Sequence, residues 1–337
     1  MPLWRDNLAS REIKLGGEHP DTLVSLNNLA SLLAEIGDFI GAEPLFRRVL
    51  SAREHMCGAE HPDTLVSLSN LANLLYARGS MVEAEQLLQR ALAVSERSLG
   101  SLHPATVNRL NSLASVLYAK GDLGGAEALY RRALAVREEK LGPQHPDTLG
   151  SLNNLANLLA DKGEFAGAEQ LYRRALETQE RTLGPEHPST MMSLNNLANL
   201  FAEKGDLTGA EPLYRRALAV QERILGPEHP TTLMSLSNLA VLLKNKGDVD
   251  SAEPLHRRAL EVRARTLGAK HPDTLGSLLN LAVLLVDKGD LTEGEPFAER
   301  AEQGYLAILG PEHPYTKKAQ QFLAAVREMR AAQTGGK

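Results

Sequence analysis

Cysteine is almost absent from this sequence of 337 residues, which holds Cys57 alone. No disulfide can therefore form within the chain, as is usual for proteins of a reducing compartment. Cys57 stands where other segments of the chain carry leucine, so we expect it to be buried as a small apolar side chain and unreactive. On this basis we expect a cytoplasmic protein.

A strong charge of either sign and long apolar runs are also missing. The net charge is −5 and the isoelectric point is near 6.1. Nucleic acids and anionic membranes attract basic patches, so neither is an expected partner. No stretch approaches the ~20 apolar residues of a membrane helix. At the N-terminus, Arg5 and Asp6 stand where a signal peptide needs its apolar run.

The common sequence motifs of catalysis and cofactor binding are lacking as well. The chain contains no GxxxxGK[ST] phosphate loop, no HExxH, no GxSxG and no CxxC. Its carboxylates are not concentrated in one unusual segment. We therefore predict that the protein is not an enzyme and that it binds no cofactor.

His-Pro pairs, by contrast, recur at a constant interval of 42 residues. Their histidines are His19, His61, His103, His145, His187, His229, His271 and His313. Internal repeats of about 20–50 residues indicate stacked supersecondary units. Helices of such units are about 8–10 Å apart, so histidines of successive repeats cannot share a metal ion, and we predict no metal site.

Residues 17–58 represent one repeat, which contains two amphipathic helical patterns. The first includes Leu23, Leu26, Leu29, Ala30 and Leu33, and the second Ala42, Leu45, Phe46, Val49 and Leu50. Gly37 and Gly58 end the two helices. The recurring stretch LGPEHP then restarts the next repeat, with histidine as a candidate N-cap and proline at the first helical position.

The segment SLNNLANLLADKGEFAGAEQLYRRALETQERTLGPEHP, Ser151 to Pro188, shows the pattern most fully. It resembles the tetratricopeptide repeat, in the 42-residue form of kinesin light chains. The resemblance covers nearly the whole chain. It implies an all-α, right-handed superhelical solenoid of antiparallel helix pairs.

The two ends depart from the pattern. Residues 1–16 align with a second helix alone, residues 17–310 hold seven full repeats, and residues 311–337 supply a polar capping helix and a short tail. We interpret the start as a truncated repeat. Part of the apolar stripe of Leu3, Trp4 and Leu8 should then lie open, which predicts end-to-end self-association through the N-terminal helix, or fraying of that helix.

The second helices carry a regular charge pattern in which glutamate precedes arginine by four residues. The pairs are Glu43 and Arg47, Glu127 and Arg131, Glu169 and Arg173, Glu211 and Arg215, and Glu253 and Arg257. This order favours ion pairs along a helix. The stripe is interpreted as a solvated outer face, with a docking stripe as the alternative.

Asparagine, a poor helix former, recurs in the middle of the first helices. Nine residues after the histidines stand Asn28, Asn70, Asn154, Asn196, Asn238 and Asn280. The preceding position holds Asn27, Asn111, Asn153 and Asn195. The resemblance implies that such side chains line the concave groove and bond to the backbone of an extended peptide. The alternative is that they bond to the neighbouring repeat and hold the stack together.

Further positions of the expected groove change along the chain. Twelve residues after the histidines stand Ser31, Asn73, Ser115, Asn157, Asn199, Val241 and Val283, which predicts a polar N-terminal half and a more apolar C-terminal end. Glu35, Asp161, Glu203 and Asp287 add acid and favour a ligand with some basic residues. Relatives that clamp a carboxylate terminus carry lysine where this chain has Val24, Val66, Asn108, Gly150, Met192, Met234 and Gly276. That ligand class is therefore not expected.

Together these features predict a non-catalytic protein–protein interaction scaffold that binds a peptide segment or a partner protein in its concave groove. The alternative is the sensor or scaffold arm of a larger signalling protein, with an NTPase or effector domain before Met1. The start within a repeat favours this alternative.

Overall fold

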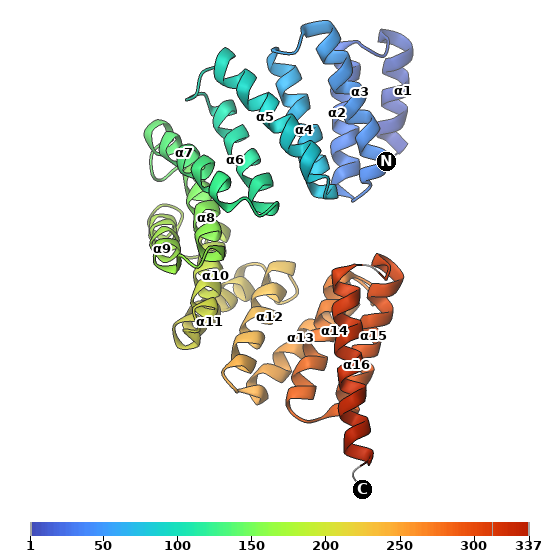
Figure 1. The fold of residues 1–337 in the computed structure, drawn as a ribbon, viewed down its shortest axis with the longest axis vertical. Coiled ribbons are helices and arrows are strands. Elements are labelled where there is room, and N and C mark those ends of the chain that lie inside the picture. The colour runs from blue at the N-terminus through green and yellow to red at the C-terminus, as the bar shows by residue number, and fades with distance from the viewer. Residues whose placement is uncertain (1, 312, 336–337) are drawn as a thin grey trace. The chain divides into compact units, whose positions relative to one another are not determined.

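The computed structural model describes residues 2–311 and 313–335, and the side chains of residues 8–311 and 313–333. Every regular element in these residues is a helix (Figure 1). The sixteen helices are α1 (Pro2–Leu15), α2 (Pro20–Glu35), α3 (Phe39–Cys57), α4 (Pro62–Arg78), α5 (Met81–Ser98), α6 (Pro104–Ala119), α7 (Leu123–Leu141), α8 (Pro146–Asp161), α9 (Phe165–Thr182), α10 (Pro188–Glu203), α11 (Leu207–Ile224), α12 (Pro230–Asn245), α13 (Val249–Thr266), α14 (Pro272–Asp287), α15 (Leu291–Leu309) and α16 (Pro314–Gly335).

The chain divides into two compact units, Met1–Leu171 (unit 1) and Tyr172–Lys337 (unit 2), with the boundary inside α9. In unit 1 the pairs α2/α3, α4/α5 and α6/α7 pack together, and in unit 2 the pairs α10/α11, α12/α13 and α14/α15 do so. The second helix of each pair also packs on the first helix of the next pair. This confirms the predicted all-α array of helix pairs.

The histidine ladder caps the first helix of each pair. In α2 the Nδ1 atom of His19 accepts a hydrogen bond from the backbone N–H of Asp21 at 3.2 Å, and Pro20 takes the first helical position. The same cap forms at the other seven histidines of the ladder. Proline loses nothing there because its missing N–H would have no partner in the first turn. The predicted role of the His-Pro pair is thus confirmed.

A glycine and an aspartate make the turn inside the pair α2/α3. Gly37 has a φ of 81°, in the left-handed region where a side chain would be strained. Asp38 then caps α3 by accepting the Gly41 N–H at 2.9 Å. The glycine was expected from the sequence. The aspartate cap, which recurs at Asp122, Asp206, Asp248 and Asp290, was not.

The core repeats with the helices. Alanine at the first buried position of the second helices is completely buried, which lets the two helices of a pair approach closely. These residues are Ala42, Ala84, Ala126, Ala168, Ala210 and Ala252. Phe46 and Tyr214 are buried four residues further on, as predicted. In unit 2, Tyr214 packs in one cluster with Leu236 and Leu239. Each buried leucine contributes about 1.5–3 kcal/mol.

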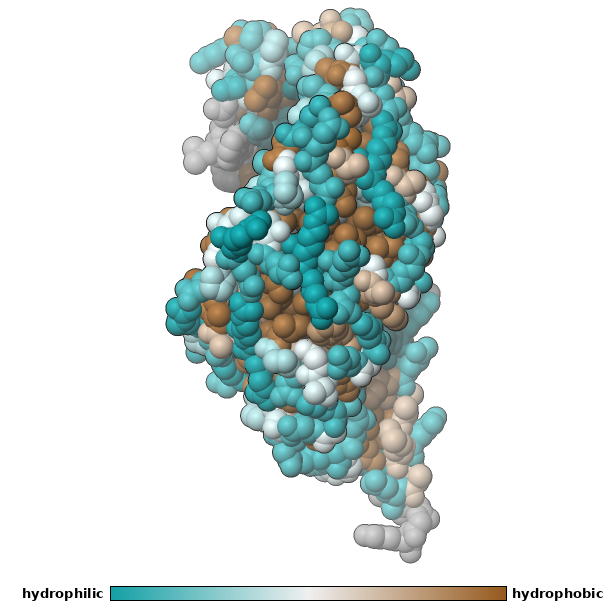
Figure 2. Space-filling model, turned by 90° about the vertical axis from the view of Figure 1, so that its left-hand side faces the viewer, coloured by the Kyte–Doolittle hydropathy of each residue, from teal (hydrophilic) through white to brown (hydrophobic). Residues whose placement is uncertain are grey.

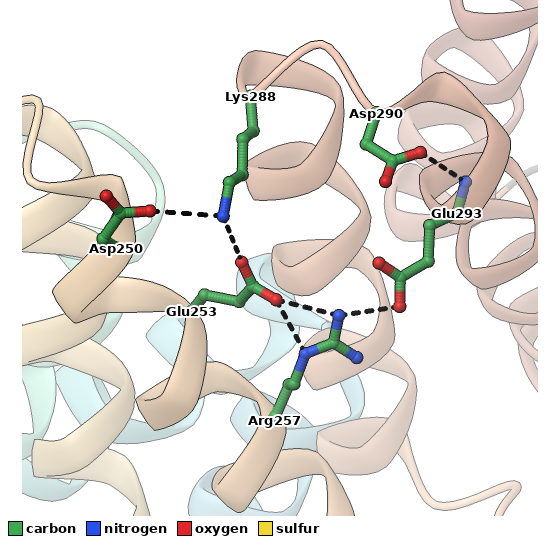
Figure 3. A network of polar contacts seen from close by, with 6 residues as sticks. All are labelled: Asp250, Glu253, Arg257, Lys288, Asp290 and Glu293. Atoms are coloured by element: carbon green, nitrogen blue, oxygen red, sulfur yellow. Dashed lines mark hydrogen bonds and ion pairs between the residues drawn. The ribbon is translucent and has the colours of Figure 1, made fainter.

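Ion networks join successive pairs, as Figure 3 shows for α13, α14 and α15. Glu253 accepts hydrogen bonds from Arg257 Nε and Lys288 Nζ, both at 2.9 Å. Arg257 also bonds to Glu293 at 2.7 Å, and Lys288 lies 3.2 Å from Asp250. The hydrogen bonds from Lys288 and Arg257 lower the pKa of the Glu253 carboxyl. The network therefore ties three helices together.

Equivalent networks extend the ion pairs that the sequence predicts along the charged stripe. Glu43, Glu127 and Glu211 each bond to the arginine four residues ahead and to a basic residue 35 residues ahead. Their side chains are only 17–20% exposed. The arginines of the stripe are 45–57% exposed, so this face is in contact with solvent while its glutamates are held in the networks. The signal that sequence reasoning missed is the basic residue one helix further on.

One further expectation needs correction, and another is tested only at Leu8. Cys57 is exposed, not buried, because it is the last residue of α3, a position where Leu141 and Leu183 are exposed as well. At the N-terminus Leu8 is buried and α1 packs against α2, so the expected stripe is not open at Leu8. The side chains of Leu3 and Trp4 lie outside the described residues.

Candidate functional site

The asparagines nine residues after the histidines lie on the first helices of their pairs. Asn28 is exposed, and the others in this column, Asn70, Asn154, Asn196, Asn238 and Asn280, are half-buried. Asn70 donates to Asn27 Oδ1 of the preceding repeat at 2.9 Å. Among the residues that the structure describes, the side chains of Asn196 and Asn238 have no hydrogen-bond partner. These two amides can therefore bond to an incoming group.

The preceding column of asparagines is only partly engaged within the protein, because the Oδ1 atoms of Asn111, Asn153 and Asn195 are buried without a hydrogen-bond partner among the described residues. Asn153 and Asn195 are 7% and 4% exposed. Asn195 donates to Ser235 Oγ of the next repeat at 2.8 Å, and Asn111 donates to the Val107 carbonyl of its own helix at 3.1 Å. Of the two alternatives left by the sequence, a role in holding the stack together fits Asn195.

The third column, twelve residues after the histidines, contacts the second helix of its own pair. Asn199 accepts a hydrogen bond from the hydroxyl of Tyr214, and Ser115 lies 2.9 Å from the hydroxyl of Tyr130. Asn73 and Asn157 are exposed. The side-chain N–H groups of Asn199 are thus available to a ligand, whereas its Oδ1 atom already accepts the hydrogen bond from Tyr214.

In unit 2 these columns line two adjoining hollows between α10 and α12. The first encloses about 450 Å³. Its lining residues are Pro188, Ser189, Met192, Asn195, Asn196, Asn199, Thr231, Met234 and Asn238. The second is lined by Asn199, Ala202, Glu203, Tyr214, Asn238, Val241, Leu242 and Asn245. Because both share Asn199 and Asn238, they form one continuous depression, which we call the asparagine groove.

Two methionines give the groove an apolar wall that sequence reasoning missed. Met192 and Met234 are 53% and 48% exposed, although methionine is usually buried. They were noted in the sequence only as positions that lack lysine. Methionine is flexible and polarisable, so it adapts to ligands of different shape. Large exposed thioethers beside unpaired amides are the signal that could have identified this segment.

The groove carries little charge. Burial, with a contribution from Glu203, raises the pKa of the Tyr214 hydroxyl to about 12, so this hydroxyl stays protonated and donates to Asn199. Of the acidic residues expected in the groove, Glu203 lines it, whereas Asp287 pairs with Lys244 at 2.8 Å. Asp161 of unit 1 accepts a hydrogen bond from Tyr118. The acidic character predicted from the sequence is therefore partly neutralised.

Other titratable groups do not form a site. His256 is 2% exposed, and burial lowers its pKa to about 4, so it is a neutral core residue at neutral pH. Within the described residues, no group of three His, Cys, Asp or Glu side chains could hold a metal ion.

A search of the same residues for an apolar helix long enough to cross a membrane finds none. Figure 2 shows one face of the molecule, on which hydrophilic residues predominate and hydrophobic ones lie between them.

Comparisons with known proteins agree with this architecture. Two family models described as tetratricopeptide repeat match the chain. One matches residues 63–139, 108–180, 147–222, 190–263 and 233–286, and the other matches residues 22–63 and 274–315. The curated proteins give no significant match.

Solved structures are similar to the chain as well. A kinesin-light-chain-type protein of Podosopora anserina with nearly identical TPR-like repeats is 29% identical, with a TM-score of 0.56 over 61% of this chain and 97% of that one. BtubC (BKLC) of P. vanneervenii is 28% identical, with a TM-score of 0.55 over 70% of this chain and 92% of that one. RapI, 14% identical, shares the fold with a TM-score of 0.62 over 85% of this chain and 98% of that one.

The family models reach from residue 22 to residue 315, and the structure places a capped helix pair in each repeat along that span. Each pair begins at a His-Pro of the 42-residue ladder. The chain therefore belongs to the tetratricopeptide repeat family, and it is similar to kinesin-light-chain-type members of that family.

Proposed function

We propose that this protein is a non-catalytic scaffold whose asparagine groove binds an extended peptide segment of a partner protein. Tetratricopeptide repeats generally mediate protein–protein interaction. The observation that carries the proposal is the pair of half-buried, unpaired amides of Asn196 and Asn238 on neighbouring repeats. A side-chain amide donates and accepts at once, as the backbone of an extended peptide requires.

The wall of the groove supports binding of an adaptable ligand. Met192 and Met234 stand beside the two asparagines and supply apolar contact area. Backbone hydrogen bonds give affinity without regard to sequence, whereas side-chain contacts give selectivity. We therefore expect peptides with apolar residues opposite the methionines.

The charges of the groove favour a ligand that is close to neutral. Glu203 is the charged residue among those that line it, and Lys244 beyond it is paired with Asp287. Exposed charges separated by more than about 8–10 Å are screened at physiological salt. We expect a strongly acidic peptide to bind poorly.

A binding role also fits the titratable groups of the groove. Glu203 and Tyr214 are its titratable side chains, and the raised pKa of Tyr214 keeps this hydroxyl neutral and hydrogen-bonded to Asn199. A general base near neutral pH needs a group poised to lose and regain a proton. The Tyr214 hydroxyl therefore stays protonated near pH 7, which suits recognition and not proton transfer.

The proposal is tested with a random peptide library displayed on phage and the full chain as target. Peptides selected on the wild type should lose at least about tenfold in affinity for the double variant Asn196→Ala/Asn238→Ala, since two hydrogen bonds are removed. Asn70→Ala is the matched control, because Asn70 stands in the same column outside the groove and its amide is bonded to Asn27. Equal binding by the wild type and the double variant would refute the proposal.

A further inference from the structure

A third hollow of unit 2 adjoins the asparagine groove at the start of α10 and α12. It encloses about 280 Å³ and is lined by Glu186, Pro188, Met191, Val220, Gln221, Ile224, Leu225, His229 and Thr231. Pro188 and Thr231 also line the groove, so the two spaces are contiguous. We call this space the Gln221 hollow.

The repeat two periods earlier provides an internal comparison. The equivalent hollow of unit 1, which contains Arg137 in place of Gln221, encloses only about 30 Å³. The Arg137 guanidinium donates to the Asp147 carbonyl at 2.9 Å, to Ser151 Oγ at 2.7 Å and to Asn108 Oδ1 at 2.8 Å. In this repeat the space is therefore filled, and its polar groups are satisfied from within the chain.

Three differences open the hollow in unit 2. Gln221 is shorter than Arg137, Met192 replaces Asn108, and the serine equivalent to Ser151 is already bonded to Asn195. Gln221 is 1% exposed, and both its Nε2 and its Oε1 lack a hydrogen-bond partner among the described residues. A buried polar group without a partner costs about 1–3 kcal/mol. A complementary ligand group would recover this free energy.

We propose that the Gln221 hollow binds the side chain of a glutamine in the peptide that occupies the asparagine groove. This inference rests on the proposed function. Both polar atoms of Gln221 are covered in this structure, so its side chain must turn toward the hollow, where a primary carboxamide can donate to Oε1 and accept from Nε2 at the same time. Its aliphatic stem fits the apolar wall formed by Met191, Val220 and Ile224.

The charges around the hollow favour this neutral ligand. Glu186 at the rim pairs with Arg223, and His229 uses its Nδ1 atom to cap α12 at the Thr231 N–H. No charged group of the lining is therefore left to neutralise a charged ligand side chain. A purely apolar side chain would fill the volume but would leave the Gln221 amide unpaired, which lowers its affinity.

The first test uses butyramide as a probe, because it carries the stem and carboxamide of glutamine without a peptide. It is titrated into the full chain with ¹³C-labelled methionine and isoleucine methyl groups. Saturable shifts of the Met191 and Ile224 signals are expected in the wild type. They should vanish in Gln221→Arg, whose longer side chain occupies the hollow, and weaken about tenfold in Gln221→Leu. Absent shifts in the wild type, or equal affinity in the variants, would overturn the inference.

The second test separates this inference from the proposed function. In peptides selected on the wild type, replacing one glutamine by leucine should weaken binding about tenfold, and Gln221→Leu should abolish that difference. Peptides that depend on Asn196 and Asn238 but show no glutamine preference would refute this inference and leave the groove intact. If butyramide binds but the library yields no peptide that binds the wild type, the proposed peptide-binding function of the groove is refuted instead.

Discussion

Arg137 in unit 1 and Gln221 in unit 2 occupy the same position of the repeat but have opposite surroundings. Arg137 is bonded to three groups of its own unit, whereas both polar atoms of Gln221 are unpaired in a buried, mainly apolar space. The neighbouring first-helix position changes in parallel, from Asn108 to the exposed Met192. The comparison indicates that the same repeat can be closed by internal hydrogen bonds or left open for a ligand.

The largest expected effect is the loss of stability when a core leucine is replaced, and this loss should be the same in the two units. Leu152 in unit 1 and Leu236 in unit 2 are equivalent and completely buried. Replacing either by alanine removes the same core contacts, so each should lower the free energy of unfolding by about 2–5 kcal/mol. Hydrogen exchange read by mass spectrometry measures the loss in each unit. A loss in one unit alone would show that the cores, and not only the hollows, differ.

The next effect is a pH dependence confined to unit 2. The pKa of His256 is about 4 in the folded state and about 6.5 in the unfolded state. Burial is the main cause of the lowered pKa, and the positive charges of Lys244 and Arg263 add to it. Between these values the unfolded state binds more protons. His256 therefore does not reduce the free energy of unfolding above pH ~6.5. As the pH falls from ~6.5 toward ~4, it lowers this free energy by about 3 kcal/mol.

Urea unfolding between pH 7.5 and 4 measures this loss, and His256→Phe serves as the control. Phe46 fills the equivalent position in another repeat, so the variant keeps the core while removing the titrating group. The wild type should lose about 3 kcal/mol more than His256→Phe over this range. Identical pH profiles for the two proteins would rule out the buried neutral state of His256.

Replacement of the residues at the compared position should have unequal effects. Arg137→Gln removes three hydrogen bonds and should lower the free energy of unfolding by about 1–3 kcal/mol. Gln221→Leu removes a buried amide that has no partner among the described residues, so it should leave the free energy of unfolding unchanged or raise it. Urea unfolding compares the two variants. Equal losses would contradict the distinction between a closed and an open repeat.

The smallest expected difference separates two adjacent residues of α10. Asn195→Ala breaks the buried hydrogen bond to Ser235 and should cost about 1 kcal/mol. Asn196→Ala removes an unpaired amide and replaces a poor helix former, so the melting temperature should stay equal or rise slightly. Differential scanning calorimetry distinguishes the two. A larger loss for Asn196→Ala would assign its amide to the stack.

The repeating features of the fold followed from the sequence because they depend on local chemistry. His-Pro caps, glycine turns and the apolar stripes recur every 42 residues and were all expected. The aspartate caps and the ion networks were missed. The bond between Glu253 and Lys288 joins residues 35 positions apart, and its partner is apparent only when neighbouring helix pairs are packed together.

The candidate site was only partly predictable for the same reason. Sequence spacing located the asparagine columns but left open which amides bond to protein and which stay unpaired. The adjacent residues Asn195 and Asn196 differ in this respect because Ser235 of the next repeat lies within reach of one of them. The Gln221 hollow depends on the simultaneous placement of three helices, which spacing along the chain does not reveal.

Side-chain amide NMR of the full chain tests the central claim most directly. A peptide selected from the random library is added, and the NH₂ signals of Asn196, Asn238 and Asn70 are followed by ¹⁵N spectroscopy. The account predicts large, saturable shifts and slowed hydrogen exchange at Asn196 and Asn238, with little change at Asn70, whose amide is bonded to Asn27. Unchanged signals at Asn196 and Asn238 in the saturated complex would contradict it.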